Sequence, residues 1–188
     1  MKTSSLETTN TILTIGHSTH ILDTFINLLQ THGVKHLIDV RTVPRSRRNP
    51  QFNKDTLPDS LNNAGIRYTH MSGLGGLRRP HPDSPNTGWR NLSFRGFADY
   101  MQTPEFEKNL LNLIEIARDE QITLMCAEAL PWRCHRSLIA DALSVREIKI
   151  EHIMGTKTRQ THHLTPWAVV NGKNIVYPPE SSQVNHKT

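Results

Sequence analysis

The sequence predicts an α/β fold, a mostly parallel five-stranded sheet with helices on both faces, followed by a C-terminal β-hairpin. Short apolar runs alternate along the chain with segments whose apolar residues recur at helical spacing. This alternation is typical of strand–helix–strand units, whose strands lie parallel. The length of 188 residues favours a single α/β domain with its own core, which we expect to span residues 11–155.

The first half of this domain is expected to begin with a strand over residues 12–15 and a helix whose apolar positions lie between residues 21 and 29. Ser18 or Thr19 is expected to cap this helix. Gly33 is expected to end it, because glycine adopts the left-handed conformation common after helix C-termini. A second strand over 37–40, a short helix over 55–63 and a third strand over 66–70 should follow.

Residues 73–91 have the proline, glycine and asparagine content of a long loop, and such a loop is either disordered or functional. A short helix is expected next, over residues 94–101. Thr103-Pro104-Glu105 predicts the start of a longer helix, because a capping hydroxyl precedes a proline at the first helical position. A fourth strand (122–125), a last helix (135–144) and a fifth strand (148–153) complete the domain.

The C-terminal part of the chain is more polar. Residues 156–180 are expected to form a hairpin extension, because Asn171-Gly172 stands between two apolar runs. His162 and His163 are expected to be a solvated loop pair. We expect residues 1–10 to be a disordered N-terminus and residues 181–188 a disordered tail, since both segments are polar.

The composition favours a cytoplasmic protein without membrane contact. No segment approaches the roughly 18 consecutive apolar residues of a membrane span, and the opening residues lack the apolar core of a signal peptide. Two cysteines are too few for a secreted disulfide framework. Lys and Arg number 22 against 17 Asp and Glu, a net charge of +5 that favours an anionic small molecule or nucleic acid as partner.

Charged and reactive side chains follow each of the first four expected strands. His17 follows the first strand and Arg41 the second, a glycine-rich turn follows the third, and the loop from Cys126 to Arg136 follows the fourth. In an open parallel sheet these positions share the carboxyl edge, where ligands bind. We therefore expect one site built from four loops.

Cys134 is the candidate nucleophile of this site. It stands at the start of a helix beside Arg133 and His135, and both helix N-termini and cations lower the pKa of a thiol. An inert, half-buried thiol is the alternative. Glu128 either transfers protons or pairs with an arginine, and Cys126 either packs in the core or faces the site.

The strand that leads into this loop, followed by Arg136-Ser137 and a helix, resembles the active loop of rhodanese-type sulfurtransferases and cysteine phosphatases. The run of residues 37–41 resembles an early rhodanese strand. Those enzymes enclose a compact cradle between cysteine and arginine, whereas nine residues separate Cys126 from Arg136 here. The similarity therefore implies a shared α/β shape more than a shared chemistry.

A closer similarity is to the domain-of-unknown-function 488 family, over about residues 12–154. Its motifs stand in the family's order and approximate spacing: Thr14-Ile15-Gly16-His17-Ser18, Asp39-Val40-Arg41, Pro44-Arg45-Ser46, Phe52, Tyr68, Leu74-Gly75-Gly76, Cys126-Ala127-Glu128, Pro131 and Cys134-His135-Arg136. The resemblance implies a small soluble α/β domain and supplies no reaction. It places His17, Asp39, Arg41, Glu128, Cys134, His135 and Arg136 at the family's motif positions.

We expect an enzyme that acts on an anionic, phosphate- or nucleotide-containing substrate. The expected catalytic residues are Cys134 as nucleophile, His135 and Glu128 in proton transfer, Asp39 orienting a cation or a histidine, and His17. The expected substrate-binding residues are Arg41, Arg45, Arg136, Tyr68 and Gly75.

Two further functions stay open. One is nucleic-acid binding without catalysis, in which Arg45, Arg47 and Arg48 would contact phosphates. The other is a rhodanese- or phosphatase-like cysteine enzyme.

No cofactor motif is evident in the sequence. A metal site in which Cys126, Cys134 and His135 join His17 is disfavoured, because zinc ligands usually show tighter paired spacing.

Overall fold

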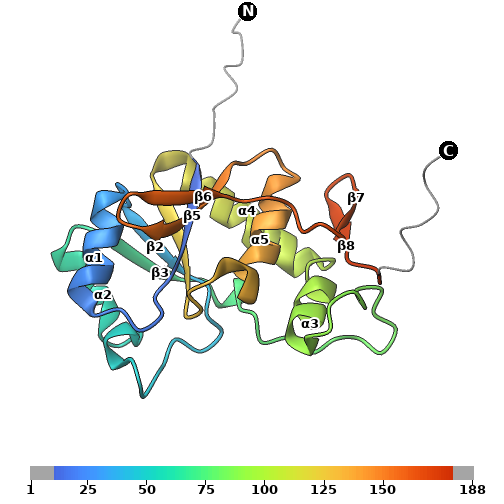
Figure 1. The fold of residues 1–188 in the computed structure, drawn as a ribbon, viewed down its shortest axis with the longest axis horizontal. Helices are drawn as coiled ribbons and strands as arrows, with labels where there is room; N and C mark the ends of the chain where they lie inside the picture. The colour runs from blue at the N-terminus through green and yellow to red at the C-terminus, as the bar shows by residue number, and fades with distance from the viewer. Residues whose placement is uncertain (1–10, 180–188) are drawn as a thin grey trace, which may run out of the picture.

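The structure, a computed structural model, describes residues 11–179 and contains one main sheet (Figure 1). Its strands are β1 (Ile12–Gly16), β2 (His36–Asp39), β3 (Arg67–His70), β4 (Ile122–Cys126), β5 (Ile150–Gly155) and β6 (Thr158–Thr161). Their order in the sheet is β3-β2-β4-β1-β5-β6. The strands β1 to β5 run parallel and β6 pairs antiparallel with β5. The predicted α/β class and mostly parallel sheet are confirmed.

The sheet has six strands rather than the five that we expected. The extra strand, β6, has the sequence Thr-Arg-Gln-Thr, and all of its residues are exposed. An edge strand of this kind is held by its backbone pairing with β5 and not by buried side chains. It therefore lacks the apolar run from which a strand is predicted.

Helices cover both faces of the sheet, as predicted. They are α1 (Leu22–Thr31), α2 (Leu57–Asn63), α3 (Leu92–Tyr100), α4 (Pro104–Asp119) and α5 (Arg136–Ser144), with short 3-10 turns η1 (Pro50–Phe52), η2 (Ser72–Leu74) and η3 (Pro131–Arg133). Successive strand residues point to opposite faces. Ile12 thus belongs to the core under α3, α4 and α5, whereas Leu13 belongs to the core under α1 and α2.

Two of the three helix ends predicted from the sequence are found in the structure. The side chain of Thr103 accepts a hydrogen bond from the backbone N–H of Phe106 and caps α4, as predicted. Gly33 follows α1 with φ of 70°, which confirms the predicted left-handed end of that helix. The expected cap at Ser18 or Thr19 is wrong, because α1 begins after Ile21 and has no side-chain cap.

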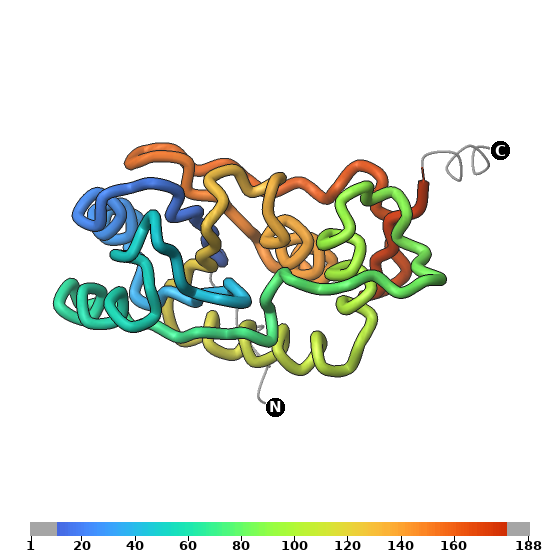
Figure 2. Tube along the Cα trace, turned by 90° about the horizontal axis from the view of Figure 1, so that it is seen from below, coloured from blue at the N-terminus to red at the C-terminus, as the bar shows by residue number. Residues whose placement is uncertain are grey.

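The predicted C-terminal hairpin is formed by β7 (Val169–Asn171) and β8 (Asn174–Val176), which turn at Gly172 with φ of 60°. Figure 2 shows it beside α3, at the opposite end of the molecule from α1 and α2. The hairpin is tied to the domain by Tyr177, which is buried and donates a hydrogen bond to Asp141 of α5 at 2.8 Å.

The disorder expected over residues 1–10 and 181–188 concerns segments outside the described residues.

Between residues 11 and 179, none of the helices has the length and apolar character needed to cross a membrane.

Candidate functional site

The carboxyl edge of the sheet carries a pocket of about 590 Å³. The strand order explains how it forms, because β1 and β2 both neighbour β4. The backbone N–H of His17 donates to Cys126 O at 2.9 Å, and that of Val40 donates to Met125 O at 3.0 Å. Three loops are thereby held side by side. Among the residues that line the pocket are His17, Arg41, Arg45, Gly76, Cys126, Glu128, Arg133, Cys134 and His135.

The loop after β4 passes directly over the end of β1. A Cβ atom placed on Gly16 would lie 1.9 Å from the backbone oxygen of Glu128, which is far inside contact distance. Only glycine lets the two backbones approach this closely. Gly16 thus permits the path of the loop that brings Cys126 and Glu128 to the pocket.

Two thiols and one imidazole form a cluster in the wall of the pocket. The sulfur atoms of Cys126 and Cys134 and one ring nitrogen of His135 all lie within 4.8 Å of one another. Cys126 is half-buried and Cys134 is only 4% exposed. Cys126 is therefore the more accessible of the two sulfurs.

The orientation of His135 is fixed by backbone oxygens. Its Nε2 lies 3.1 Å from Val40 O and 3.0 Å from Leu74 O. Carbonyl oxygens only accept hydrogen bonds, so Nε2 carries the hydrogen and Nδ1 is the nitrogen with the free lone pair. Nδ1 lies 3.6 Å from the sulfur of Cys134. The imidazole thus presents a base to the two thiols.

The two thiols share a hydrogen bond, which separates their pKa values. The hydrogen bond from Cys134 lowers the pKa of the Cys126 thiol well below its usual range, and His135 lowers it further. Burial, together with the neighbouring Cys126, raises the pKa of Cys134 well above its usual range. The lowered pKa that the sequence predicted for Cys134 is found at Cys126 instead.

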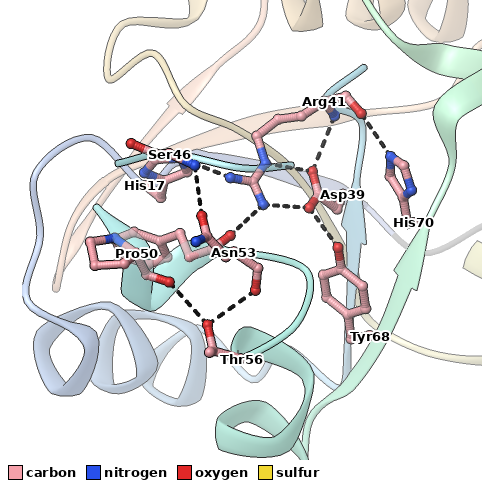
Figure 3. Close-up of polar contacts among 10 residues, drawn as sticks. His17, Asp39, Arg41, Ser46, Pro50, Asn53, Thr56, Tyr68 and His70 are labelled. Carbon is pink, nitrogen blue, oxygen red and sulfur yellow. Dashed lines mark hydrogen bonds and ion pairs between the residues drawn. The ribbon is translucent and has the colours of Figure 1, made fainter. Parts of the chain in front are cut away.

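Asp39 and Arg41 form a buried ion pair next to this cluster (Figure 3). Arg41 Nε donates to Asp39 Oδ1 at 2.8 Å and Nη2 donates to Oδ2 at 2.6 Å. Nη2 also donates to Phe52 O at 2.7 Å. The hydroxyl of Tyr68 donates to Asp39 at 2.7 Å, and burial raises the pKa of this phenol. Asp39 and Tyr68 therefore hold Arg41 in place and do not themselves line the pocket.

His17 contacts the other side of the Arg41 guanidinium, as Figure 3 shows. Its Nε2 accepts from Arg41 Nη1 at 3.2 Å, and its Nδ1 donates to Ser18 O at 2.9 Å. The ring stacks on Phe52 with 4.3 Å between centroids. Burial lowers the pKa of His17, and this neutral imidazole positions Arg41.

The other predicted site residues lie in different environments. Arg136 is 1% exposed and does not line the pocket. Its Nη2 donates hydrogen bonds to Glu128 O at 2.8 Å and to Ala129 O at 3.1 Å.

Glu128 is exposed and lines the pocket. Arg45 lies at its rim and reaches Asp55 at 3.4 Å. Gly75 is buried behind the wall, against Thr42.

Two residues of the site were not among the expected catalytic or substrate-binding residues. Arg133 adds an exposed guanidinium to the pocket lining. A Cβ atom on Gly76 would lie 2.4 Å from Nδ1 of His135, so this glycine fits against the imidazole. The glycine-rich run marked this turn as unusual, but its contact with His135 depends on the fold.

A second polar cluster lies away from the pocket, between β1, β5 and α5. Asp141 is fully buried and its Oδ1 lies 2.8 Å from His162 Nε2. His162 Nδ1 lies 3.1 Å from His152 Nε2, and His152 Nδ1 lies 2.7 Å from the hydroxyl of Thr14. The expectation that His162 is solvated is wrong, because its side chain is only 6% exposed.

A protein-family model described as "Domain of unknown function DUF488" matches residues 21–143 of this chain. The matched segment includes Asp39, Arg41, both cysteines and His135. No curated protein and no solved structure matches the chain.

Proposed function

The chain belongs to the family described as domain of unknown function DUF488, a description that names no reaction, and we propose from its site that it is an enzyme acting on an anionic, phosphate-containing substrate. The observation that most supports this proposal is the meeting of a thiol–imidazole cluster and three arginines in one pocket. The pocket of about 590 Å³ also has the size of small-molecule sites, which span roughly 300–1,000 Å³.

Arginines from separate loops would hold the anion. Arg41 lines the pocket from the loop after β2, Arg45 from its rim, and Arg133 from the loop after β4. Glu128 is the one carboxylate residue among the lining residues of the described chain. The charge of Arg41 is balanced by Asp39, so Arg45 and Arg133 supply the surplus of positive charge over Glu128. This surplus favours an oxyanion, which a guanidinium can bind through two hydrogen bonds.

The cluster of Cys126, Cys134 and His135 would form the reactive end of the pocket. Cys126 is its most accessible member, and His135 presents Nδ1 to both sulfurs. Glu128 offers an exposed carboxylate for proton transfer. Asp39 and His17 would act through Arg41, whose guanidinium they position.

Binding of inorganic phosphate, pyrophosphate and a panel of nucleotides, measured by calorimetry, tests this proposal. Arg133→Gln and Arg45→Gln should each weaken oxyanion binding by at least roughly 10-fold, since a charge-assisted hydrogen bond contributes about 1.5–3 kcal/mol. Arg118→Gln is the matched control, because Arg118 is exposed on α4 and contacts Glu115. Oxyanion binding that ignores Arg133 and Arg45, or no binding at all, would overturn the proposal.

Turnover is the second arm of the test. The same compounds, together with sugar phosphates, are incubated with the protein and their products are identified by mass spectrometry. A compound that binds in the pocket should be converted, and Cys126→Ser should abolish the conversion while the protein stays folded. Conversion that persists in Cys126→Ser would show that the cluster is not the reactive centre.

Nucleic-acid binding without catalysis is the second candidate function, and the mouth of the pocket favours it. Val43 and Leu77 line the pocket with Arg45 and are 63% and 68% exposed. Trp132 is 54% exposed and precedes Arg133 in the chain, although its own side chain lies outside the pocket lining. Exposed aromatic and apolar groups next to arginines suit stacking on bases. This candidate expects binding of single-stranded oligonucleotides that weakens steeply with salt, and no turnover.

The rhodanese- or phosphatase-like alternative receives no support from Arg136. In such an enzyme this arginine would have to face the substrate. Here its guanidinium is buried and donates to two backbone oxygens of the loop after β4.

A further inference from the structure

We propose that Cys126, Cys134 and His135 bind one divalent transition-metal ion of the zinc class at the wall of the pocket. Two sulfurs and one ring nitrogen lie within 4.8 Å of one another, which is close enough for one ion to reach all three after small side-chain rotations. Thiolate and imidazole donors together favour zinc over magnesium or calcium, which prefer oxygen ligands.

The imidazole of His135 is already oriented as a ligand. Its Nε2–H points at Val40 O and Leu74 O, so Nδ1 turns its lone pair toward the sulfurs. Metal-binding histidines usually donate their second ring N–H to a carbonyl or carboxylate, which fixes both the tautomer and the ring plane. Gly76 supports this placement, because a side chain there would push the ring away.

The remaining coordination position would be filled from the pocket. All three donor residues line it, and within residues 11–179 no fourth Cys, His, Asp or Glu joins their group. Zinc sites with three protein ligands are typical of catalysis, because a water or a substrate oxygen takes the fourth position. The arginines of the same pocket would hold the rest of an anionic substrate beside the ion.

The catalytic role of the ion rests on the proposed function, whereas its binding does not. A bound ion would polarise a water or a substrate oxygen, and the two sulfurs would be ligands in place of nucleophiles. Metal binding and turnover are therefore measured in separate experiments.

Metal binding is measured on the full chain after treatment with a chelator, by titration with zinc against a competing dye and by addition of cobalt(II). We expect one ion per chain and thiolate-to-cobalt charge-transfer absorption. Cys126→Ser, Cys134→Ser and His135→Asn should each weaken zinc binding by at least about 100-fold, since even outer residues of such sites contribute 10- to 100-fold. His163→Asn is the matched control, because His163 is exposed and lies outside the group.

A measurement without any variant covers the case in which a cysteine variant does not fold. Zinc added to the wild-type protein should protect both Cys126 and Cys134 from alkylation by iodoacetamide, as read by mass spectrometry. Unprotected thiols, or a cobalt spectrum without thiolate absorption, would overturn the metal site.

The two proposals fail separately. If zinc does not bind but Cys126→Ser abolishes turnover of a phosphate compound, the metal inference is wrong and the proposed function stands. If zinc binds tightly but no oxyanion binds or reacts, the ion is structural and the proposed function is wrong.

Discussion

The carboxylate of Asp39 accepts two parallel hydrogen bonds from the guanidinium of Arg41, from Nε to Oδ1 at 2.8 Å and from Nη2 to Oδ2 at 2.6 Å. Asp39 is completely buried, and Arg41 is 6% exposed at the pocket wall. The ion pair therefore has two effects. It stabilises the carboxyl edge of the sheet, and it holds the guanidinium of Arg41 at the pocket wall.

Replacing Asp39 by Asn should destabilise the protein by about 3 kcal/mol, because removing one partner leaves a buried charge without compensation. Urea unfolding measures this change. The matched control is Asp55→Asn, whose exposed pair with Arg45 should contribute less than about 1 kcal/mol. Equal effects of the two substitutions would contradict the buried role of Asp39.

Replacing Gly76 by Ala should disturb His135 without disrupting the sheet. The new Cβ would lie 2.4 Å from Nδ1 of a ring held by two backbone oxygens, so the ring must shift. Overpacking of this kind costs about 1–3 kcal/mol. Gly155→Ala is the control, because its Cβ would make only ordinary contacts near 3.9 Å.

Both glycine variants are compared by unfolding and by the nuclear magnetic resonance signals of the His135 ring. Gly76→Ala should shift those signals and Gly155→Ala should leave them in place. Unchanged His135 signals in Gly76→Ala would show that the glycine is not needed to seat the ring.

The buried His152 should make the protein less stable in mild acid. Burial lowers its pKa to about 3, and the charges of His162 and Arg136 add to this effect. The unfolded chain binds a proton at this residue below about pH 6.5, whereas the folded protein does not until far lower pH. The free energy of unfolding contributed by this residue therefore falls by about 1.4 kcal/mol between pH 7.5 and 5.5.

The comparison of unfolding free energies at these two pH values checks the assignment. His152→Gln should lose this part of the pH dependence, although it is less stable at both values because it lacks the contacts with Thr14 and His162. His163→Gln should keep the wild-type slope, since that side chain is exposed. A wild-type slope in His152→Gln would assign the effect to another group.

Much of the fold could be predicted because it follows local patterns. Apolar periodicity gave the helices and the parallel strands, and the Thr103 cap and the Gly33 turn obey rules of single helix ends. The strand β6 could not be predicted, because its side chains carry no burial signal. Its place depends on backbone pairing with β5.

The candidate site, too, could be predicted only in part. A parallel sheet brings the loops after its strands to one edge, so a shared pocket could be expected. Which side chains enter that pocket depends on packing between distant segments. Arg136 turns to Glu128 O, and the partner of His162 is Asp141 on a helix 21 residues earlier. Neither contact has a sequence pattern from which it could be inferred.

Anomalous diffraction from crystals soaked in tungstate, an oxyanion that imitates phosphate, tests most directly whether an anion binds beside the thiol–imidazole cluster. We expect a tungsten peak inside the pocket, within hydrogen-bond reach of Arg41 or Arg133 and next to Cys126. The peak should weaken in Arg133→Gln and keep its height in Arg118→Gln. A pocket without tungsten in the wild-type protein, or with tungsten only at other surfaces, would contradict the account.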